Sequence, residues 1–542
     1  MSGTPSPGLQ RFLLVVGDAL RRGDVAGAMN YADQAVSQGF EEPNLLALAG
    51  QLHLRNGDVA RSHKMLLRAR ELGPDNLEAL NALGICLTMM GRPKDALEAF
   101  DYGLVLAPDA PFLLVHRAQA LENAGRLREA HAALEQVIAR APTEARALEH
   151  LASLCVRRGD MKRAREYATR ALKVTAPLPA ATIALAAADL SERNYEAVRA
   201  RSAPLAGEPR IGPVNQSIAL GLLGDAFDGL DKPAEAFAAY TEAREALRGP
   251  MEAMLKGQES AIARVRRLAD YFGAAPIAPW RAGALAQPGP VATHAFLVGF
   301  PRSGTTVLEQ ALASHPDVRT MEEVDCLGDA VGEFFYAENG MARFSSLGEE
   351  ELARYRDIYW RRVADAGIAA DRAVLVDKMP LNSVHLGLVA RLFPQAKILF
   401  ALRDPRDVVL SCFRRRLVMT AHMYELATLD GAASFYDAVM RLAALYRERL
   451  KLPFLDLRHE DMIADFDGET RRLCAFLGIE WRDSMRNFAA DARGRDIKTP
   501  SAMQVVRGLN KDGVGQWRRF AAQMAPVLPL LAPWVERFGY EQ

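Results

Sequence analysis

The stretch GFPRSGTT, residues 299–306, decides how the second half of this chain is expected to fold. It follows the apolar run 295–298 and precedes residues 307–312, whose apolar positions favour a helix. A strand, a glycine-bounded turn and a helix in this order direct backbone N–H groups and the positive end of a helix dipole at one point, where an anion binds. We therefore predict a phosphate-binding turn at residues 299–306.

The spacing of the two glycines is that of the Walker A pattern G-x-x-x-x-G-K-[ST], but Thr305 stands where that pattern has lysine. Arg302 supplies a cation from within the turn instead. The turn is thus expected to hold phosphate, and ATP is only one candidate ligand.

Composition narrows the class of protein. The chain has 542 residues, enough for two to four domains, and 67 basic residues balance 67 acidic ones, which gives no indication of a nucleic-acid partner. The five cysteines are scattered without a C-x-x-C, so we expect neither disulfides nor a zinc site, and a reducing compartment. No segment approaches the ~20 apolar residues that span a bilayer. The apolar stretch Phe12 to Val16 is too short for a signal peptide, and we expect a cytoplasmic protein.

The first half contains an internal repeat of 34 residues. The glycines that recur at this interval are Gly23, Gly57, Gly91, Gly125 and Gly159. Five positions after each comes a small residue, in order Ala28, Ser62, Ala96, Ala130 and Ala164. Prolines keep the same interval at Pro74, Pro108 and Pro142. A turn glycine, a small contact residue and a proline after the second helix describe an antiparallel helix pair.

This pattern resembles tetratricopeptide repeats over residues 10–247, as about seven units. The pattern weakens at Arg193-Asn194 and resumes out of phase at Gly229. Such arrays stack into a superhelix whose concave face usually holds a peptide or another protein, so we expect a protein partner. The alternative is an array that only caps or dimerises the second half.

A helix over residues 259–271 and two proline-rich stretches follow the repeats, and they predict a linker over residues 248–290. In the remaining domain, 291–542, strands are expected at 294–299, 373–377, 397–402 and 453–457. Helices are expected at 305–314, 382–393, 404–416 and 469–477. Apolar strands that alternate with amphipathic helices predict a parallel sheet covered on both faces, with ligands at the carboxyl ends of its strands.

A second motif, LFALRDPRDVVLS at residues 399–411, places Arg403 at a strand tip and Ser411 two turns into the next helix. An arginine fork and a hydroxyl at that position would grip a second phosphate. The alternative for Arg403 is a local ion pair with Asp404. The basic run 414–416 is either a solvated face or brings one arginine to the same phosphate.

Together the two motifs resemble sulfotransferases that use 3′-phosphoadenosine-5′-phosphosulfate (PAPS). The sequence of residues 296–324 is similar to that of the tyrosylprotein sulfotransferase branch. The arrangement of repeats before such a domain looks like that of the bacterial repeat-containing sulfotransferases. The resemblance covers residues 290–540 and implies an α + α/β fold: a tetratricopeptide superhelix followed by a P-loop-like parallel-sheet sulfotransferase domain. It implies transfer of a sulfuryl group from PAPS to an acceptor hydroxyl.

The resemblance also assigns donor-binding roles. The residues that it places on the 5′-phosphosulfate are Arg302, Ser303, Gly304, Thr305 and Thr306. Those that it places on the 3′-phosphate are Arg403, Ser411 and Arg415. In the segment that would fold over the nucleotide, the expected contacts are Ser501 and either Arg507 or Lys511, unless this segment is an ordinary surface loop.

Catalytic roles are implied in the same way for Glu323, Lys378 and Arg302. Glu323 matches the general base, with its neighbour Glu322 as competing candidate, and Lys378 matches the lysine that contacts the leaving group. Sulfuryl transfer resembles phosphoryl transfer, in which positioning and charge stabilisation dominate, and neither role needs a metal. The alternatives are a helix cap for Glu323 and a surface lysine for Lys378.

Two positions depart from the pattern of this family. His459 stands where related sequences have a tyrosine that meets the adenine, so donor binding is expected to be altered rather than abolished. Asp325 stands where the tyrosylprotein branch has an arginine, which argues against an identical acidic peptide substrate.

Two other functions stay open. One is a P-loop kinase or triphosphatase, in which residues 374–377 would form a Walker B strand that directs Asp377 at Mg²⁺. The other is a non-catalytic repeat protein that carries a decayed enzyme domain.

Overall fold

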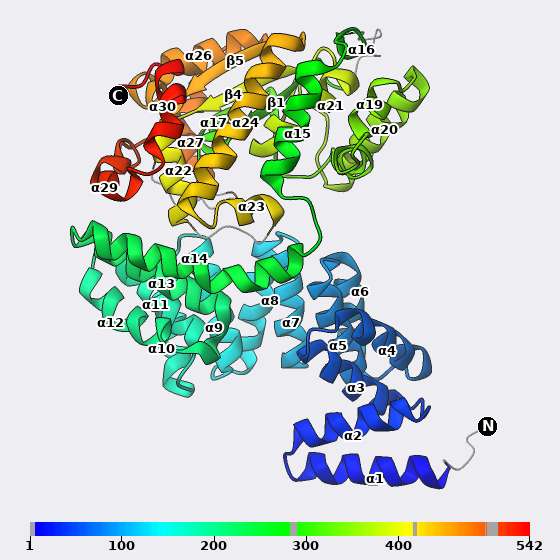
Figure 1. Cartoon of the computed structure of the whole chain (residues 1–542). Helices are drawn as coiled ribbons and strands as arrows, with labels where there is room; N and C mark the ends of the chain where they lie inside the picture. The colour runs from blue at the N-terminus through cyan, green and yellow to red at the C-terminus, as the bar shows by residue number, and fades with distance from the viewer. Residues whose placement is uncertain (1–5, 282–289, 416–419, 494, 496–507, 542) are drawn as a thin grey trace. The chain divides into compact units, whose positions relative to one another are not determined.

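The computed structural model describes residues 6–281, 290–415, 420–493, 495 and 508–541 (Figure 1). The chain divides into two compact units, Met1–Ala188 and Asp189–Gln542. This partition has a different boundary from the predicted domains 10–247, 248–290 and 291–542, which stay a prediction. Among the described residues, no helix is both long and apolar enough to cross a membrane.

The first unit consists of antiparallel helix pairs with the predicted 34-residue period. Its helices are α1 (Pro7–Arg21), α2 (Val25–Ser37), α3 (Pro43–Arg55), α4 (Val59–Leu72), α5 (Leu77–Met89), α6 (Pro93–Leu106), α7 (Pro111–Asn123), α8 (Leu127–Arg140), α9 (Ala145–Arg157) and α10 (Met161–Val174), with α11 (Pro179–Ser191) across the boundary. The five repeat glycines end the first helix of each pair with φ of 76°, 82°, 71°, 75° and 77°, a conformation that favours glycine. The five small residues after them are fully buried where two helices touch.

The helix pairs continue beyond the last repeat glycine into α12 (Tyr195–Ala206), α13 (Gly212–Gly229) and α14 (Pro233–Leu255). Arg193 keeps the 34-residue interval and adopts φ of 60° in place of a glycine. The next turn falls at Asp231, with φ of 58°, and not at Gly229, which is the last residue of α13. An aspartate tolerates this left-handed conformation better than most residues, so the turn forms without glycine.

The second unit contains a five-stranded parallel sheet in the order β2-β3-β1-β4-β5. The strands are β1 (Thr293–Gly299), β2 (Val318–Glu322), β3 (Val374–Lys378), β4 (Lys397–Leu402) and β5 (Phe454–Arg458). Four of them were predicted within one residue. β2 was missed because, of its side chains, only Val318 and Met321 are buried at this edge of the sheet. The sequence VRTME therefore lacks an apolar run.

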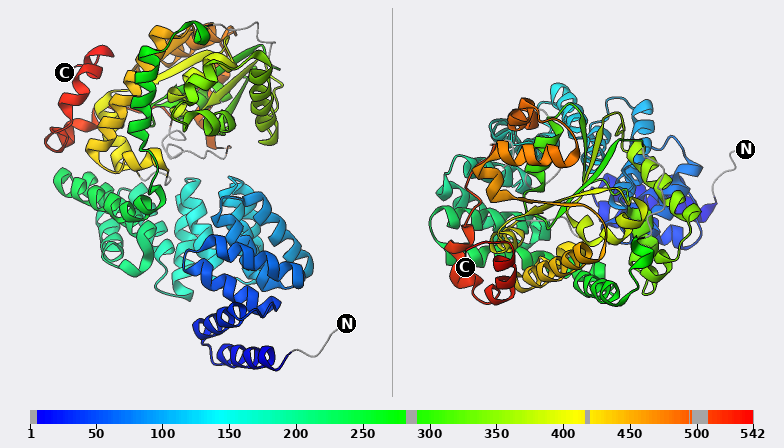
Figure 2. Two further views of the ribbon diagram at one scale, coloured as in Figure 1. Left: turned by 45° about the vertical axis from the view of Figure 1, so that its right-hand side comes forward. Right: turned by 90° about the horizontal axis from the view of Figure 1, so that it is seen from above.

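Helices cover both faces of the sheet (Figure 2). Phe296 and Phe400 face a core shared with α20 (Glu349–Asp365), α21 (Leu386–Leu392), α22 (Pro405–Arg414) and α24 (Leu429–Arg449). Leu297 and Leu399 face the opposite core, shared with α17 (Thr305–Ala313), α26 (Phe466–Leu477) and α27 (Phe488–Arg493). Strands buried on both faces explain the continuous apolar runs of the sequence.

The other described elements of this unit are short or lie at its periphery. They are η1 (Pro209–Ile211), α15 (Ala261–Ala274), α16 (Ala278–Arg281), α18 (Gly328–Ala330), η2 (Val331–Phe335), α19 (Gly340–Ser345), η3 (Pro380–Val384), α23 (Ala421–Glu425), α25 (His459–Ala464), η4 (Asp483–Asn487), η5 (Gln516–Phe520), α29 (Ala521–Met524) and α30 (Leu528–Arg537). The predicted helix 382–393 is a 3₁₀ turn, η3, followed by α21, because His385 interrupts the helical geometry.

The helix pair α13–α14 packs on the sheet domain within the second unit. Ala236 and Tyr240 of α14 belong to the same buried core as the sheet residue Phe296. The rings of Phe237 in α14 and Phe413 in α22 lie 5.0 Å apart. The final helix pair of the repeat region is therefore a structural part of this unit.

Candidate active site

The turn between β1 and α17 has the geometry of an anion cradle. Gly304 is the N-cap of α17 with φ of 95°, and Arg302 adopts φ of 73°. Such a conformation costs an arginine on the order of 1–3 kcal/mol and is retained mainly at functional sites. A Cβ on Gly304 would lie 2.9 Å from Nδ1 of His459. Glycine is required here both for the backbone conformation and for the close approach of His459.

Arg302 joins the two predicted phosphate motifs. Its Nε donates to Oγ of Ser411 in α22 at 3.1 Å, and its carbonyl accepts from Nη1 of Arg403 at 3.1 Å. Arg403 also donates from Nη2 to the carbonyl of Gly513. The predicted alternative, an Arg403–Asp404 ion pair, is wrong, because Asp404 pairs with Arg406 at 2.8 Å.

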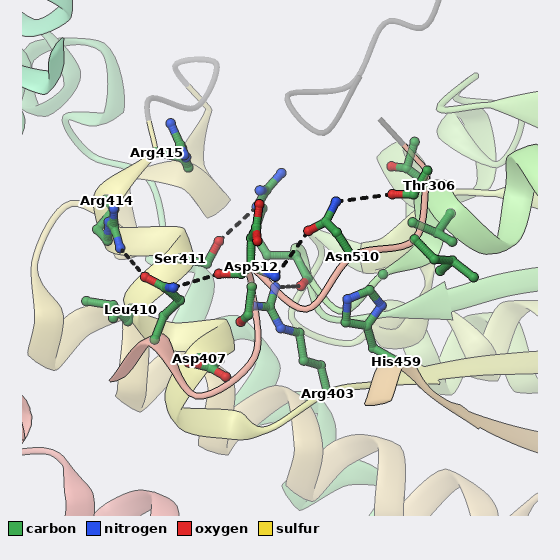
Figure 3. Close-up of a pocket in the computed structure, with 17 residues that line it drawn as sticks. Thr306, Arg403, Asp407, Leu410, Ser411, Arg414, Arg415, His459, Asn510 and Asp512 are labelled. Atoms are coloured by element: carbon green, nitrogen blue, oxygen red, sulfur yellow. Dashed lines mark hydrogen bonds between the residues drawn. The ribbon is translucent and has the colours of Figure 1, made fainter. Parts of the chain in front are cut away.

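A cavity of about 260 Å³ lies between the two motifs (Figure 3). The residues that line this cavity and were named in the sequence analysis are Arg302, Gly304, Thr306, Arg403, Ser411, Arg415 and His459. Ser303 and Thr305 are buried in the turn, and Lys511 is exposed; none of the three is among the described residues that line the cavity. Ser501 and Arg507 lie outside the described residues.

Positive charge is concentrated around this cavity. Burial, together with the charges of Arg415 and Arg403, lowers the pKa of Arg302 to about 10. Burial and the two arginines Arg403 and Arg302 lower the pKa of His459 to about 3, so its imidazole is neutral at pH 7. The buried Nε of Arg403 has no hydrogen-bond partner among the described residues. An anion in the cavity would relieve this repulsion.

The basic run at the end of α22 is not merely a solvated face. Arg414 donates to Oδ2 of Asp228 at 2.6 Å and to the hydroxyl of Tyr240 at 3.1 Å. Arg415 lines the cavity and donates to Oδ2 of Asp225 at 3.1 Å. Arg416 lies outside the described residues.

The segment 508–520 forms another wall of the cavity and was not predicted in detail. Asp407 of α22 holds this segment, because its carboxylate accepts from the N–H of Gly515 at 2.6 Å and of Trp517 at 2.9 Å. Burial raises the pKa of Asp407, opposed by the charge of Arg403. Arg414, from the basic run 414–416, also lines the cavity. The further lining residues that were not named from the sequence are Val307, Asp407, Leu410, Gly508, Leu509, Asn510, Asp512, Gly513 and Gln516. Asp407 had a signal as the last acidic residue of RDPRD.

A second polar cluster lies at the carboxyl ends of β2 and β3. Nζ of Lys378 is 3.0 Å from Oε1 of Glu323, 3.2 Å from Oε2 of Glu309 and 3.9 Å from Oε1 of Glu322. The N–H of Glu323 donates to the carbonyl of Lys378 at 2.9 Å, and Glu323 adopts φ of 51°. Lys378 is fully buried, so it is not a surface lysine. Leu327, not Glu323, is the N-cap of the following helix α18.

Glu309 of α17 was missed by sequence reasoning, although a glutamate one turn into an apolar helix face was a signal. It is buried, and burial raises its pKa to about 8 in spite of the attraction of Lys378. Burial alone would lower the pKa of Lys378, but the charges of Glu309, Glu323 and Glu322 raise it. Lys378 is therefore a charged ammonium held among carboxyl groups.

Asp377, the candidate Walker B aspartate, lies on the other face of β3 from Lys378. Its Oδ2 accepts from the hydroxyl of Tyr359 in α20 at 2.9 Å, and that hydroxyl is 2.9 Å from Nε2 of His294. Burial raises the pKa of Asp377 to about 7. Its side chain is thus engaged away from α17 and the phosphate turn.

Comparisons with known proteins find separate matches for the helical repeats and for the segment that contains the sheet. Residues 295–483 match the Sulfotransferase family, and residues 47–111 and 116–182 match the Tetratricopeptide repeat. Protein-tyrosine sulfotransferase A of Caenorhabditis elegans is 25% identical over 272 residues, which are 45% of this chain and 67% of that protein. The Protein-tyrosine sulfotransferase of Drosophila melanogaster is 25% identical over 259 residues, 45% of this chain and 51% of that protein.

An uncharacterized protein of Aquifex aeolicus is 24% identical over 246 residues, and the match spans 44% of this chain but about a third, 32%, of that relative. Among solved structures, the sulfotransferase domain of the Synechococcus PCC 7002 olefin synthase is 24% identical, with 47% of this chain and 97% of that domain covered and a TM-score of 0.33. The phosphate turn and most of the parallel sheet fall within residues 295–483, the part of this chain that is similar to the Sulfotransferase family, and the segments similar to the Tetratricopeptide repeat precede it.

Proposed function

We propose that this chain transfers the sulfuryl group of PAPS to the hydroxyl of an acceptor. The observation that carries the proposal is the link between Arg302 and Ser411, which joins the phosphate turn to the second motif around one arginine-rich cavity. A nucleotide with phosphates on both its 5′ and 3′ carbons needs two such anion sites, whereas a nucleoside triphosphate needs one extended site.

The donor would lie with its 5′-phosphosulfate at the turn 302–306 and its 3′-phosphate near Arg403, Ser411 and Arg415. The N-terminal N–H groups of α17 and the guanidinium of Arg302 favour negative charge at the turn. The neutral imidazole of His459 lies against Gly304 and would meet the nucleotide by stacking or hydrogen bonding. The segment that includes Ser501, Arg507 and Lys511 would cover the nucleotide.

The chemistry would take place next to the Glu323–Lys378 pair. Glu323 accepts the proton of the acceptor hydroxyl as its oxygen forms a bond to sulfur. The bond between sulfur and the bridging oxygen breaks, and Lys378 stabilises the negative charge of the departing phosphate. The 36% exposed side chain of Glu323 leaves its carboxylate accessible to an acceptor, in contrast to the buried Lys378.

The proposed acceptor is a protein hydroxyl such as that of a tyrosine, because two relatives carry the name protein-tyrosine sulfotransferase. The repeats would recruit this protein partner. Asp325 lies near the base, where burial raises the pKa of its carboxyl. An aspartate at this place disfavours a strongly acidic peptide as acceptor.

Calorimetry with adenosine 3′,5′-bisphosphate and with ATP plus Mg²⁺ tests the donor class. We expect the wild type to bind the bisphosphate tightly. Arg403→Ala should bind it at least about tenfold more weakly, because removal of a hydrogen bond to a charged group produces a loss of this size. Lys451→Ala, at an exposed basic residue before β5, is the control and should bind as the wild type does. Binding of ATP with Mg²⁺ but not of the bisphosphate would refute the proposal.

A further inference from the structure

Arg244 of α14 binds the C-terminal end of α22. Its guanidinium is buried and donates from Nε to the carbonyl of Phe413 at 2.7 Å and from Nη2 to that of Cys412 at 2.9 Å. Nη2 also donates to the carbonyl of Arg415. The last carbonyls of a helix lack partners within the helix, and a cation there is favoured by the helix dipole. Arg244 therefore fixes where α22 ends.

This end of α22 carries the residues that we assign to the 3′-phosphate. Ser411 lies in its last turn and accepts from Nε of Arg302, while Arg415 is the C-cap residue and lines the cavity. The guanidinium of Arg415 is held by Asp225 of α13 at 3.1 Å. The position of both side chains thus depends on contacts with α13 and α14.

The helix α13 also holds the segment that walls the cavity on another side. The carbonyl of Asp228 accepts from Nη2 of Arg519 at 2.6 Å, and its Oδ1 is 3.1 Å from Nη1 of the same arginine. Asp228 simultaneously pairs with Arg414 at 2.6 Å. One carboxylate therefore connects α22 with the segment 508–520.

We propose that α13 and α14 support the donor site by holding α22, and that Arg244 is a positioning residue for recognition of the donor's 3′-phosphate. This inference rests on the proposed function. The 5′ side of the site is built mainly from β1 and α17, whose neighbours include β2, β3, η4 and α27, and the Arg302–Ser411 hydrogen bond links it to α22. Loss of Arg244 should therefore impair the 3′ side more strongly than the 5′ side.

Two ligands separate the two sides of the site. Adenosine 3′,5′-bisphosphate engages both, whereas adenosine 5′-phosphate lacks the group that Ser411 and Arg415 would hold. We expect Arg244→Met to weaken binding of the bisphosphate about tenfold or more, measured by calorimetry, with binding of the 5′-phosphate changed less than about twofold. The matched control is Arg248→Met, one turn further along α14, where the arginine is exposed and pairs with Glu252 at 2.8 Å. This control should leave both affinities unchanged.

If Arg244→Met weakens the binding of both ligands equally, Arg244 has a general structural role and the inference is overturned. An unchanged preference for the bisphosphate over the 5′-phosphate would also overturn it. If thermal unfolding shows that this variant does not fold, Arg244→Lys decides in its place. A lysine keeps the charge but not the fork that reaches several carbonyls, so we expect a smaller loss confined to the bisphosphate. A loss shared by both ligands overturns the inference here too. A wild-type protein without preference for the bisphosphate would instead refute the proposed function itself.

Discussion

At the scale of single residues, Lys378 is the centre of the proposed chemistry. A fully buried ammonium is tolerated only when it is paired, and here the carboxylate of Glu323 lies 3.0 Å and the carboxyl group of Glu309 3.2 Å from its Nζ. The two carboxyl groups differ in their surroundings: Glu309 is 1% exposed and Glu323 36% exposed. The exposed partner can meet an acceptor, while the buried one holds the lysine in place.

Glu323→Gln should retain binding of adenosine 3′,5′-bisphosphate and lose at least about 100-fold in transfer rate, because an amide cannot accept the proton of the acceptor hydroxyl. Labelled sulfate transfer from PAPS measures the rate. Glu322→Gln is the matched control, since the neighbouring carboxylate lies 3.9 Å from Lys378 against 3.0 Å for Glu323. If Glu323→Gln transfers sulfate normally and Glu322→Gln is inactive, the general base is Glu322 and not Glu323.

Glu309→Gln should stabilise the protein increasingly, relative to the wild type, as the pH rises from 5 to 8. Burial raises the pKa of Glu309 to about 8, so the folded wild type keeps a proton that the unfolded chain releases near pH 4.5. Unfolding of the wild type is therefore favoured as the pH rises through this window, by up to about 1.4 kcal/mol per pH unit, and glutamine removes this dependence.

Thermal unfolding midpoints of the wild type and Glu309→Gln at several pH values measure this difference. Glu166→Gln, at an exposed glutamate of α10, is the control substitution. A pH-independent difference for Glu309→Gln would contradict the assignment of a raised pKa to this carboxyl.

The motif residues that lie at the cavity could be predicted from the sequence, and the residues of other elements that hold α22 could not. Arg302, Arg403 and Ser411 stand at motif positions, and the structure brings them together at one cavity. Asp225 and Arg244 contact α22 across about 170 to 190 residues of sequence, and no local pattern reports such a contact. Their roles follow only from the fold.

At the scale of elements, the turn from β1 into α17 depends on the packing of a separate helix. α25 begins with His459, whose ring occupies the space beside Gly304. The glycine spacing could be read from the sequence, but this constraint could not, because 155 residues separate the two positions. The edge strand β2 was missed for a related reason: its pairing with β3, not its own apolar content, makes it a strand.

Gly304→Ala should weaken binding of the bisphosphate and destabilise the protein by roughly 1–3 kcal/mol, from the strain of a positive φ and from the contact with His459. Calorimetry and thermal unfolding measure the two effects. Adding His459→Ala should recover part of the stability by removing the contact while the backbone strain stays. Gly249→Ala, at a position of α14 with open space around its Cβ, is the control and should not destabilise. A Gly304→Ala protein of wild-type stability would contradict this account of the turn.

At the scale of the whole molecule, the repeat pattern and the compact units do not end at the same residue. The helix-pair pattern continues through α13 and α14, yet these helices share a buried core with the sheet. Periodicity in the sequence reports how a segment folds locally, and it does not report which neighbour a helix face packs against. The sequence pattern alone therefore does not show how far the unit that contains the sheet extends toward the repeats.

Two truncations test whether α13 and α14 belong to the enzyme. A fragment of residues 192–542 begins in the turn before α12 and keeps the described contacts of α13 and α14 with α22; it should bind adenosine 3′,5′-bisphosphate within about twofold of the full chain. A fragment of residues 260–542 keeps Ser260, the N-cap of α15, and the whole predicted sulfotransferase domain, but lacks Arg244, Asp225 and Asp228.

The shorter fragment should lose at least about tenfold in affinity or fail to fold, because the last carbonyls of α22 and the guanidinium of Arg414 lose their partners. Thermal unfolding of each fragment separates these two results, and calorimetry gives the affinity. Binding by the shorter fragment at the strength of the full chain would mean that the donor-binding domain begins at or after residue 260, and that α13 and α14 only pack against its surface.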